Sequence, residues 1–177
     1  MSDTKPADSP RQMTPEEAAE FAEQVFNKAR EGDAAMLAAL LSRGLPANLR
    51  NHKGDTLLML ASYHGHVDAV KVLFEHKADP EVRNDNGQSP IAGAAFKGDL
   101  AVVKALIEGG AQVEGASFDG RTALMMAAMF NRTEIIDYLI SKGADPKAKD
   151  ANGITALDAA KTMGATDTVA QLEKLLG

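Results

Sequence analysis

The histidines are the side chains whose spacing comes nearest to a reactive or metal-binding arrangement. His64 and His66 are one residue apart, with His52 shortly before them, and imidazole nitrogens are common metal ligands. No cysteine is present, and no carboxylate stands where it would complete the set. His66 falls at an expected helix start, and His76 falls at the end of another helix on the far side. We therefore expect no metal site.

Residues for catalysis are also missing from the sequence. No nucleophile, base and acid form a recognisable set, and the absence of cysteine excludes thiolate nucleophiles and disulfides. The only glycine pair, Gly109-Gly110, falls at an expected helix end, and no G-x-x-x-x-G-K-[ST] motif occurs. We expect a protein that is not an enzyme and that carries no cofactor.

Composition and charge limit the classes of partner and the compartment. The net charge of -6 argues against binding to nucleic acid. The longest apolar runs, Ala34–Leu41 and Ala123–Phe130, are much shorter than the ~20 residues that a membrane span needs. The first dozen residues contain no apolar segment typical of a secretory signal, and the lack of cysteine fits a reducing compartment. We expect a cytoplasmic protein that binds neither nucleic acid nor membrane.

Glycines at a constant spacing indicate an internal repeat. Gly54, Gly87, Gly120 and Gly153 follow one another at intervals of 33 residues, and apolar columns keep the same register. A hydroxyl residue follows each glycine at the same distance, as Thr56, Ser89, Thr122 and Thr155. The period defines three full units, 51–83, 84–116 and 117–149, between a less regular unit at 14–50 and a shorter one at 150–177. Together these form one domain over 14–177, and we expect residues 1–13 to be a disordered tail.

Each unit has the signals of a turn, a short helix, a second turn and a longer helix. The turn glycines supply a positive φ, and the hydroxyl residues are placed to cap the helix that follows. In the first unit, Thr14 and Glu17 form a capping box around Pro15. The second helices carry apolar residues three and four positions apart, which is typical of one buried face.

The period and the helix-start segments TLLMLAS, SPIAGAA, TALMMAA and TALDAAK resemble the ankyrin repeat family. The resemblance implies an all-α solenoid of stacked helix-turn-helix units with projecting β-turns. The family's signature histidine is replaced by Met59, Ala92, Met125 and Asp158, which favours apolar packing at that position. Lys77 stands where other units have a helix-ending glycine.

The same resemblance implies that the concave surface of turns and first helices binds a protein partner. Transferred in register, the family's contact positions are His52, Lys53, Asp55, Tyr63, His64, Asp85, Gln88, Phe96, Lys97, Phe118, Arg121, Met129, Phe130, Ile154 and Met163.

Aromatic residues are concentrated at these expected contact positions. Tyr63, Phe96, Phe118 and Phe130 are four of the eight aromatic residues in the chain, and aromatic and methionine side chains are enriched in interface cores. The alternative is packing between neighbouring units, since Tyr63, Phe96 and Met129 share one column and could stack as a ladder.

We expect a non-catalytic protein-protein interaction module that acts as a monomer. The alternative is a dedicated stoichiometric inhibitor or regulator of an enzyme, which the short tails and the absence of a second domain in the sequence favour.

Overall fold

A computed structural model describes residues 11–177 of the protein, and the chain in that range forms helices and turns without a β-strand. The helices are α1 (Pro15–Glu31), α2 (Ala34–Ser42), α3 (Leu57–Tyr63), α4 (Val67–Glu75), α5 (Pro90–Lys97), α6 (Leu100–Glu108), α7 (Ala123–Met129), α8 (Thr133–Ser141), α9 (Ala156–Met163) and α10 (Thr166–Leu176). The predicted all-α solenoid is confirmed. The expected disordered tail concerns residues 1–10, which lie outside the described residues, and residues 11–13, which belong to no helix.

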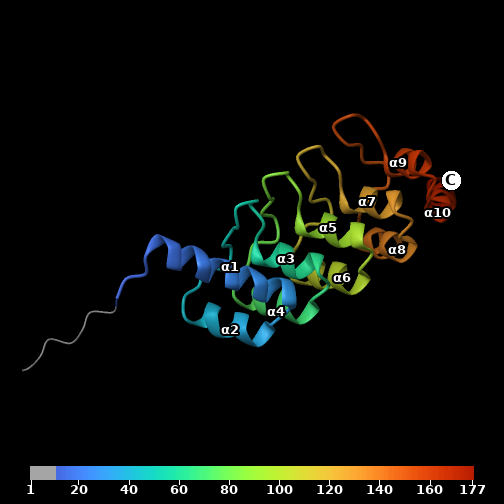
Figure 1. Ribbon diagram of the computed structural model, residues 1–177. Coiled ribbons are helices and arrows are strands. Elements are labelled where there is room, and N and C mark those ends of the chain that lie inside the picture. The colour runs from blue at the N-terminus through green and yellow to red at the C-terminus, as the bar shows by residue number, and fades with distance from the viewer. Residues whose placement is uncertain (1–10) are drawn as a thin grey trace, which may run out of the picture.

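The helices form two parallel rows (Figure 1). The first helices of the pairs, α1, α3, α5, α7 and α9, make one row, and the second helices, α2, α4, α6, α8 and α10, make the other. Each helix packs against its own pair mate and against the equivalent helices of the neighbouring pairs. The turns that precede α3, α5, α7 and α9 project from one edge of the stack. This edge and the row of first helices together form the surface on which the expected contact residues fall.

Hydroxyl caps begin the first helices, as the repeat register predicts. Thr56, Ser89, Thr122 and Thr155 each accept a hydrogen bond from the backbone N–H three residues later. Thr14 caps α1 in the same way, and the Glu17 side chain accepts the Thr14 N–H at 2.9 Å, completing the predicted capping box. These bonds satisfy backbone donors that a helix start leaves unpaired.

Within residues 11–177, two residues other than glycine adopt left-handed backbone conformations, each at a turn that follows a helix. Lys77 has φ +64° and follows α4, and Asn131 has φ +61° and lies between α7 and α8. Equivalent positions in other units carry glycine, such as Gly110 and Gly98. A side chain at such a position costs about 1–2 kcal/mol unless local bonds compensate it.

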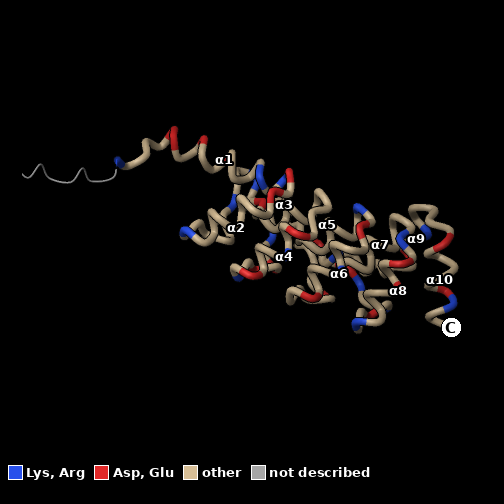
Figure 2. The backbone as a smooth tube through the Cα atoms, turned by 90° about the horizontal axis from the view of Figure 1, so that it is seen from below, with Lys and Arg blue, Asp and Glu red and all other residues tan. Residues whose placement is uncertain are grey.

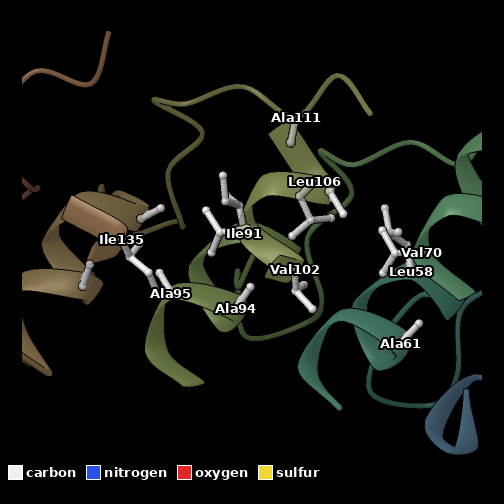
Figure 3. Packing of buried hydrophobic residues seen from close by; sticks show 14 of the residues in the cluster. Leu58, Ala61, Val70, Ile91, Ala94, Ala95, Val102, Leu106, Ala111 and Ile135 are labelled. Atoms are coloured by element: carbon white, nitrogen blue, oxygen red, sulfur yellow. The ribbon is translucent and has the colours of Figure 1, made fainter. Parts of the chain in front are cut away.

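The hydrophobic core runs continuously between the two rows of helices (Figure 3). Figure 3 shows Leu58 and Val70 of one unit packed together, and Ile91 and Leu106 among the buried residues of the next, where Ile91 is the equivalent of Leu58. Leu73, Leu106, Leu139 and Leu172 form one repeat column and are all fully buried. No pair of helices covers its own apolar face. The stabilisation of about 1.5–3 kcal/mol that comes from burying each such side chain therefore depends on the neighbouring unit.

The signature-histidine position is filled by buried side chains in the central units. Met59, Ala92 and Met125 are all buried there, which confirms the expected apolar packing. Asp158, at the same position in the last unit, instead accepts the Thr155 N–H and forms a second capping box.

Hydrogen bonds between backbone groups join each projecting turn to the next. The N–H groups of Asp85, Phe118 and Ala151 donate to the carbonyl oxygens of Lys53, Gly87 and Asp119, at 3.0, 3.2 and 2.9 Å. A second series lies at the other turns, where the side chains of Asn48, Glu81 and Glu114 accept backbone N–H groups of the following unit. These bonds fix the spacing between neighbouring turns.

Acidic and basic residues are interspersed along the described part of the stack (Figure 2). Among residues 11–177, no helix combines the length and the hydrophobicity that crossing a lipid bilayer requires.

Candidate partner-binding groove

A groove of about 900 Å³ lies along the turns and the first helices of the central units. Its apolar lining includes Met59 and Leu60 of α3, Ala92 and Gly93 of α5, and Met126 of α7. Polar residues of the turns border this apolar surface. A concave apolar surface with polar groups at its edge is the usual form of a binding site.

Most of the expected contact residues meet in this groove. Eleven of them line it: His52, Lys53, Asp55, Tyr63, His64, Gln88, Phe96, Phe118, Arg121, Met129 and Phe130. All four aromatic residues of the expected set are among them, although they come from three different units.

The remaining four expected residues lie outside the lining. Asp85 forms an ion pair with Arg50 at 3.4 Å. Lys97 adjoins the groove, because its ammonium group stands over the Tyr63 ring, 4.7 Å from the ring centroid. Ile154 and Met163 are exposed side chains of the last unit, beyond the groove.

Two of the aromatic rings pack against each other across neighbouring units. Phe96, in α5, and Phe130, the residue that ends α7, meet edge to face with centroids 4.7 Å apart. Both side chains are half-buried. Tyr63 does not join this pair, and its ring lies beside Gly93 and beneath Lys97 instead. Packing between units and an accessible aromatic surface therefore occur together in the groove.

Phe118 is the most exposed large hydrophobic residue of the described chain, with 69% of its surface accessible. Its ring nevertheless covers Gly87 of the preceding turn so closely that a β-carbon at Gly87 would collide with it. Arg83 stands over the ring, with its guanidinium carbon 5.4 Å from the centroid. One face of the ring is thus held by the protein, and much of the remainder is open to solvent.

The acidic side chains that line the groove have hydrogen-bond or ion-pair partners, whereas Lys53 of the lining and Lys97 beside it form no ion pair in the described part of the chain. Asp119 accepts the Ser117 hydroxyl, which lowers the pKa of the Asp119 carboxyl, and it pairs with Arg121 at 3.4 Å. Asp55 accepts a hydrogen bond from the Asn84 amide at 2.9 Å. Lys53 and Lys97 form no ion pair with any carboxylate of residues 11–177. The groove therefore offers positive charge to a ligand, in a chain that is acidic overall.

Two of the histidines have different surroundings, one in a contact between units and one in the groove. The Nε2 atom of His66 lies 2.7 Å from the Arg30 carbonyl oxygen and ties the second unit to α1. His64 lines the groove, and partial burial, reinforced by the nearby positive groups, lowers its pKa. Within residues 11–177, no three His, Cys, Asp or Glu side chains are grouped so that they could hold a metal ion.

Twelve residues of the groove lining were not among those expected from the sequence, and three of them share one position of the repeat. Leu60, Gly93 and Met126 occupy one repeat column, on the helix face that lines the groove. The sequence did carry a signal, because Gly93 lies inside a helix at a repeat position that is leucine in the preceding unit and methionine in the following one.

Comparison with known proteins decides the family. A family model described as ankyrin repeats, in three copies, matches residues 25–116 and 94–174. The chain belongs to the ankyrin repeat family. Ankyrin repeats generally mediate protein-protein interactions, and the family is typically non-catalytic.

Several curated proteins share parts of the sequence. An ankyrin repeat protein of Pseudomonas aeruginosa is 59% identical over 65 residues, which covers 37% of this chain and 38% of the relative. Ankyrin repeat domain-containing protein 29 of Homo sapiens is 42% identical over 60 residues, covering 33% and 20% of the two chains. BRCA1-associated RING domain protein 1 of Mus musculus is 48% identical over 42 residues, covering 24% and 6%. The matches thus span at most 38% of the length of these relatives.

Proposed function

We propose that this ankyrin repeat domain binds a segment of a protein partner in the groove between its projecting turns and its first helices. The observation that supports this most is the gathering of Tyr63, Phe96, Phe118 and Phe130 along a single groove. Half of the aromatic residues in the chain lie there. Large apolar side chains provide most of the binding energy at protein interfaces, and an accessible patch of them usually marks such an interface.

The polar edge of the groove suits the same role. Turn residues such as His52 and Gln88 border the aromatic surface and present donors and acceptors to a ligand. An interface with an apolar centre and a polar rim has the organisation found in specific complexes. The backbone hydrogen bonds between turns hold this rim in place before a partner arrives, which lowers the entropic cost of binding.

The test compares two double variants in a pull-down from the lysate of the native host. Phe118→Ser/Phe130→Ser removes two aromatic rings from the groove, and Ile154→Ser/Met163→Ser removes two exposed apolar side chains outside it. We expect a partner that the wild type and the second variant retain and that the first variant loses. Each variant is checked by thermal melting, because Phe130 also packs against Phe96.

A partner retained equally by both variants would contradict the proposal and place the contact elsewhere on the domain. If the retained partner is an enzyme, its activity is measured during titration with the purified domain. A fall in activity that is complete at one equivalent would identify the domain as a stoichiometric inhibitor, and unchanged activity would identify it as a scaffold.

A further inference from the structure

Gly93 interrupts a column of large apolar residues in the groove. The equivalent residues one unit before and one unit after it are Leu60 and Met126, and all three line the groove. Gly93 lies within α5, where glycine weakens a helix relative to alanine. Its backbone φ is not left-handed, so local conformation does not require glycine here. The absence of a side chain has another effect, which is to leave space in the groove.

The space above Gly93 is open. A β-carbon built at Gly93 would have only one heavy atom within 4 Å, the Tyr63 Cδ2 at 3.8 Å. Tyr63 therefore borders the space on one side. Phe96 follows Gly93 by three residues along α5 and so lies on the same helix face. We call the space bounded by Gly93, Tyr63 and Phe96 the Gly93 notch.

Two lysines without an ion-pair partner among residues 11–177 lie along this part of the chain, Lys97 beside the notch and Lys53 in the groove lining. The Lys97 ammonium group stands 4.7 Å from the centroid of the Tyr63 ring, and Lys53 lines the groove on the turn side. Neither lysine is paired with a carboxylate of residues 11–177. Of the acidic residues that line the groove, Asp119 is paired with Arg121, and Asp55 accepts a hydrogen bond from the neutral Asn84 amide. A ligand that carries carboxylates beside its apolar group would match this arrangement.

We propose that the Gly93 notch receives one large apolar side chain of an extended partner segment, with acidic residues next to that side chain contacting Lys53 and Lys97. This inference rests on the proposed function and specifies the chemistry of the partner. The apolar side chain provides the anchor in a pocket that excludes water. The lysines favour segments with acidic neighbours and speed their association.

The test uses a phage-displayed library of random dodecapeptides as the probe, selected on the immobilised wild-type domain. Enriched peptides are synthesised, and their affinities are measured by fluorescence anisotropy. We expect them to share a Leu, Phe, Ile or Met flanked by Asp or Glu. The Gly93→Leu variant fills the notch with the residue found at position 60, and we expect it to weaken binding by about tenfold or more. The Gly93→Ala variant adds only a methyl group and is the matched control, with an affinity close to that of the wild type.

The lysines are tested separately with Lys53→Gln/Lys97→Gln. We expect this variant to bind the same peptides several-fold more weakly than the wild type at low salt, with a difference that shrinks as salt is added. If Gly93→Leu melts at a lower temperature than the wild type, Gly93→Met, which carries the residue found at position 126, replaces it.

The outcomes distinguish a failure of the notch proposal from a failure of the proposed function of the groove. Peptides that bind Gly93→Leu as tightly as wild type, but are lost by Phe118→Ser/Phe130→Ser, overturn the notch and leave the proposed function standing. Enriched peptides without acidic residues, or with affinities unaffected by the lysine variant, overturn the charge part of the proposal. A failure to enrich any common peptide overturns the proposal as a whole, and the lysate experiment then decides the function independently.

Discussion

Phe130 stands perpendicular to Phe96, at an interplanar angle of 90° and a centroid separation of 4.7 Å. The two rings come from neighbouring units, and both line the groove. The pair therefore links the stacking of the solenoid to the surface that we propose as the binding site. A substitution of either ring affects stability as well as binding, and the two effects have to be measured separately.

The Phe96–Phe130 pair should show a measurable coupling energy. Edge-to-face aromatic pairs contribute about 0.5–1.5 kcal/mol beyond the area that they bury. We expect a double-mutant cycle of Phe96→Leu and Phe130→Leu, followed by urea unfolding, to give a coupling in that range. Additive losses in the cycle would show that the two rings touch without stabilising each other.

Asn131 should stabilise the last helix through its side chain. Its Oδ1 accepts the N–H groups of Asp167 and Thr168, each at 3.0 Å, at the start of α10, where Ala165 provides no side-chain cap. We expect Asn131→Ala to lower the free energy of unfolding by about 1–3 kcal/mol, because it removes a cap and places alanine in a left-handed conformation. Hydrogen exchange should become faster in α10 before it does in α5.

Asn131→Gly is the control for this prediction, since it relieves the backbone strain but still removes the cap. We expect its stability to fall between those of the wild type and Asn131→Ala. A glycine variant more stable than the wild type would show that the bonds to α10 contribute less than the strain at Asn131 costs.

Lys77→Gly should raise the stability of the domain, whereas Asn131→Ala lowers it. Lys77 has φ +64°, and its side chain makes no hydrogen bond or ion pair within residues 11–177 that would compensate the strain. Glycine removes a strain of about 1–2 kcal/mol but increases the entropy of the unfolded chain, which leaves a net gain of about 0.5–1 kcal/mol. A rise in melting temperature would confirm the gain. Lys77→Ala, which keeps the strain, should melt close to the wild type.

The stability of the domain should depend on the ionisation of His64. Burial is the main cause that lowers the pKa of His64 below its ordinary value of 6.5, and the positive charges of His66, Lys97 and Arg30 act in the same direction. The unfolded chain therefore takes up a proton at a higher pH than the folded chain does, so stability falls as the pH drops through about 6.5.

Urea unfolding at about pH 7.5 and about pH 5.5 measures this effect, since the two values lie on either side of the ordinary histidine pKa. We expect the wild type to lose more stability between the two than His64→Gln, in which the titrating group is absent. Equal losses in the two proteins would assign the pH dependence to other residues.

The repeat register was sufficient to predict the fold. The spacing of Gly54 and Gly87, together with the caps at Thr56 and Ser89, depends on local backbone chemistry that the sequence displays directly. The register also marked Lys77 as a residue at a glycine position, and the structure gives it the left-handed conformation of its glycine equivalents.

The directions of the groove side chains could not be predicted in the same way. The register places Tyr63 and Phe96 in one column, but the aromatic contacts run from Phe96 to Phe130 and from Tyr63 to Lys97. Side-chain direction depends on the space left by neighbours, here by Gly93, and not on the column alone. The hydrogen bond between Asn131 and Asp167 of α10 joins residues that are 36 positions apart, and no local sequence pattern predicts it.

At the outer turns, backbone groups bonded by Asn48, Glu81 and Glu114 each lie 31 residues further along the chain. The first three interfaces between units are therefore each closed by a loop of the same length, and none of them requires the two ends of the chain to meet. The entropy of closing a loop grows only with that loop's own length, and folding rates fall as contacting residues become more distant in sequence. Inserting another copy of residues 84–116 would thus lengthen the groove by one unit while leaving the cost of closing each interface, and the rate at which each new unit can join the stack, almost unchanged.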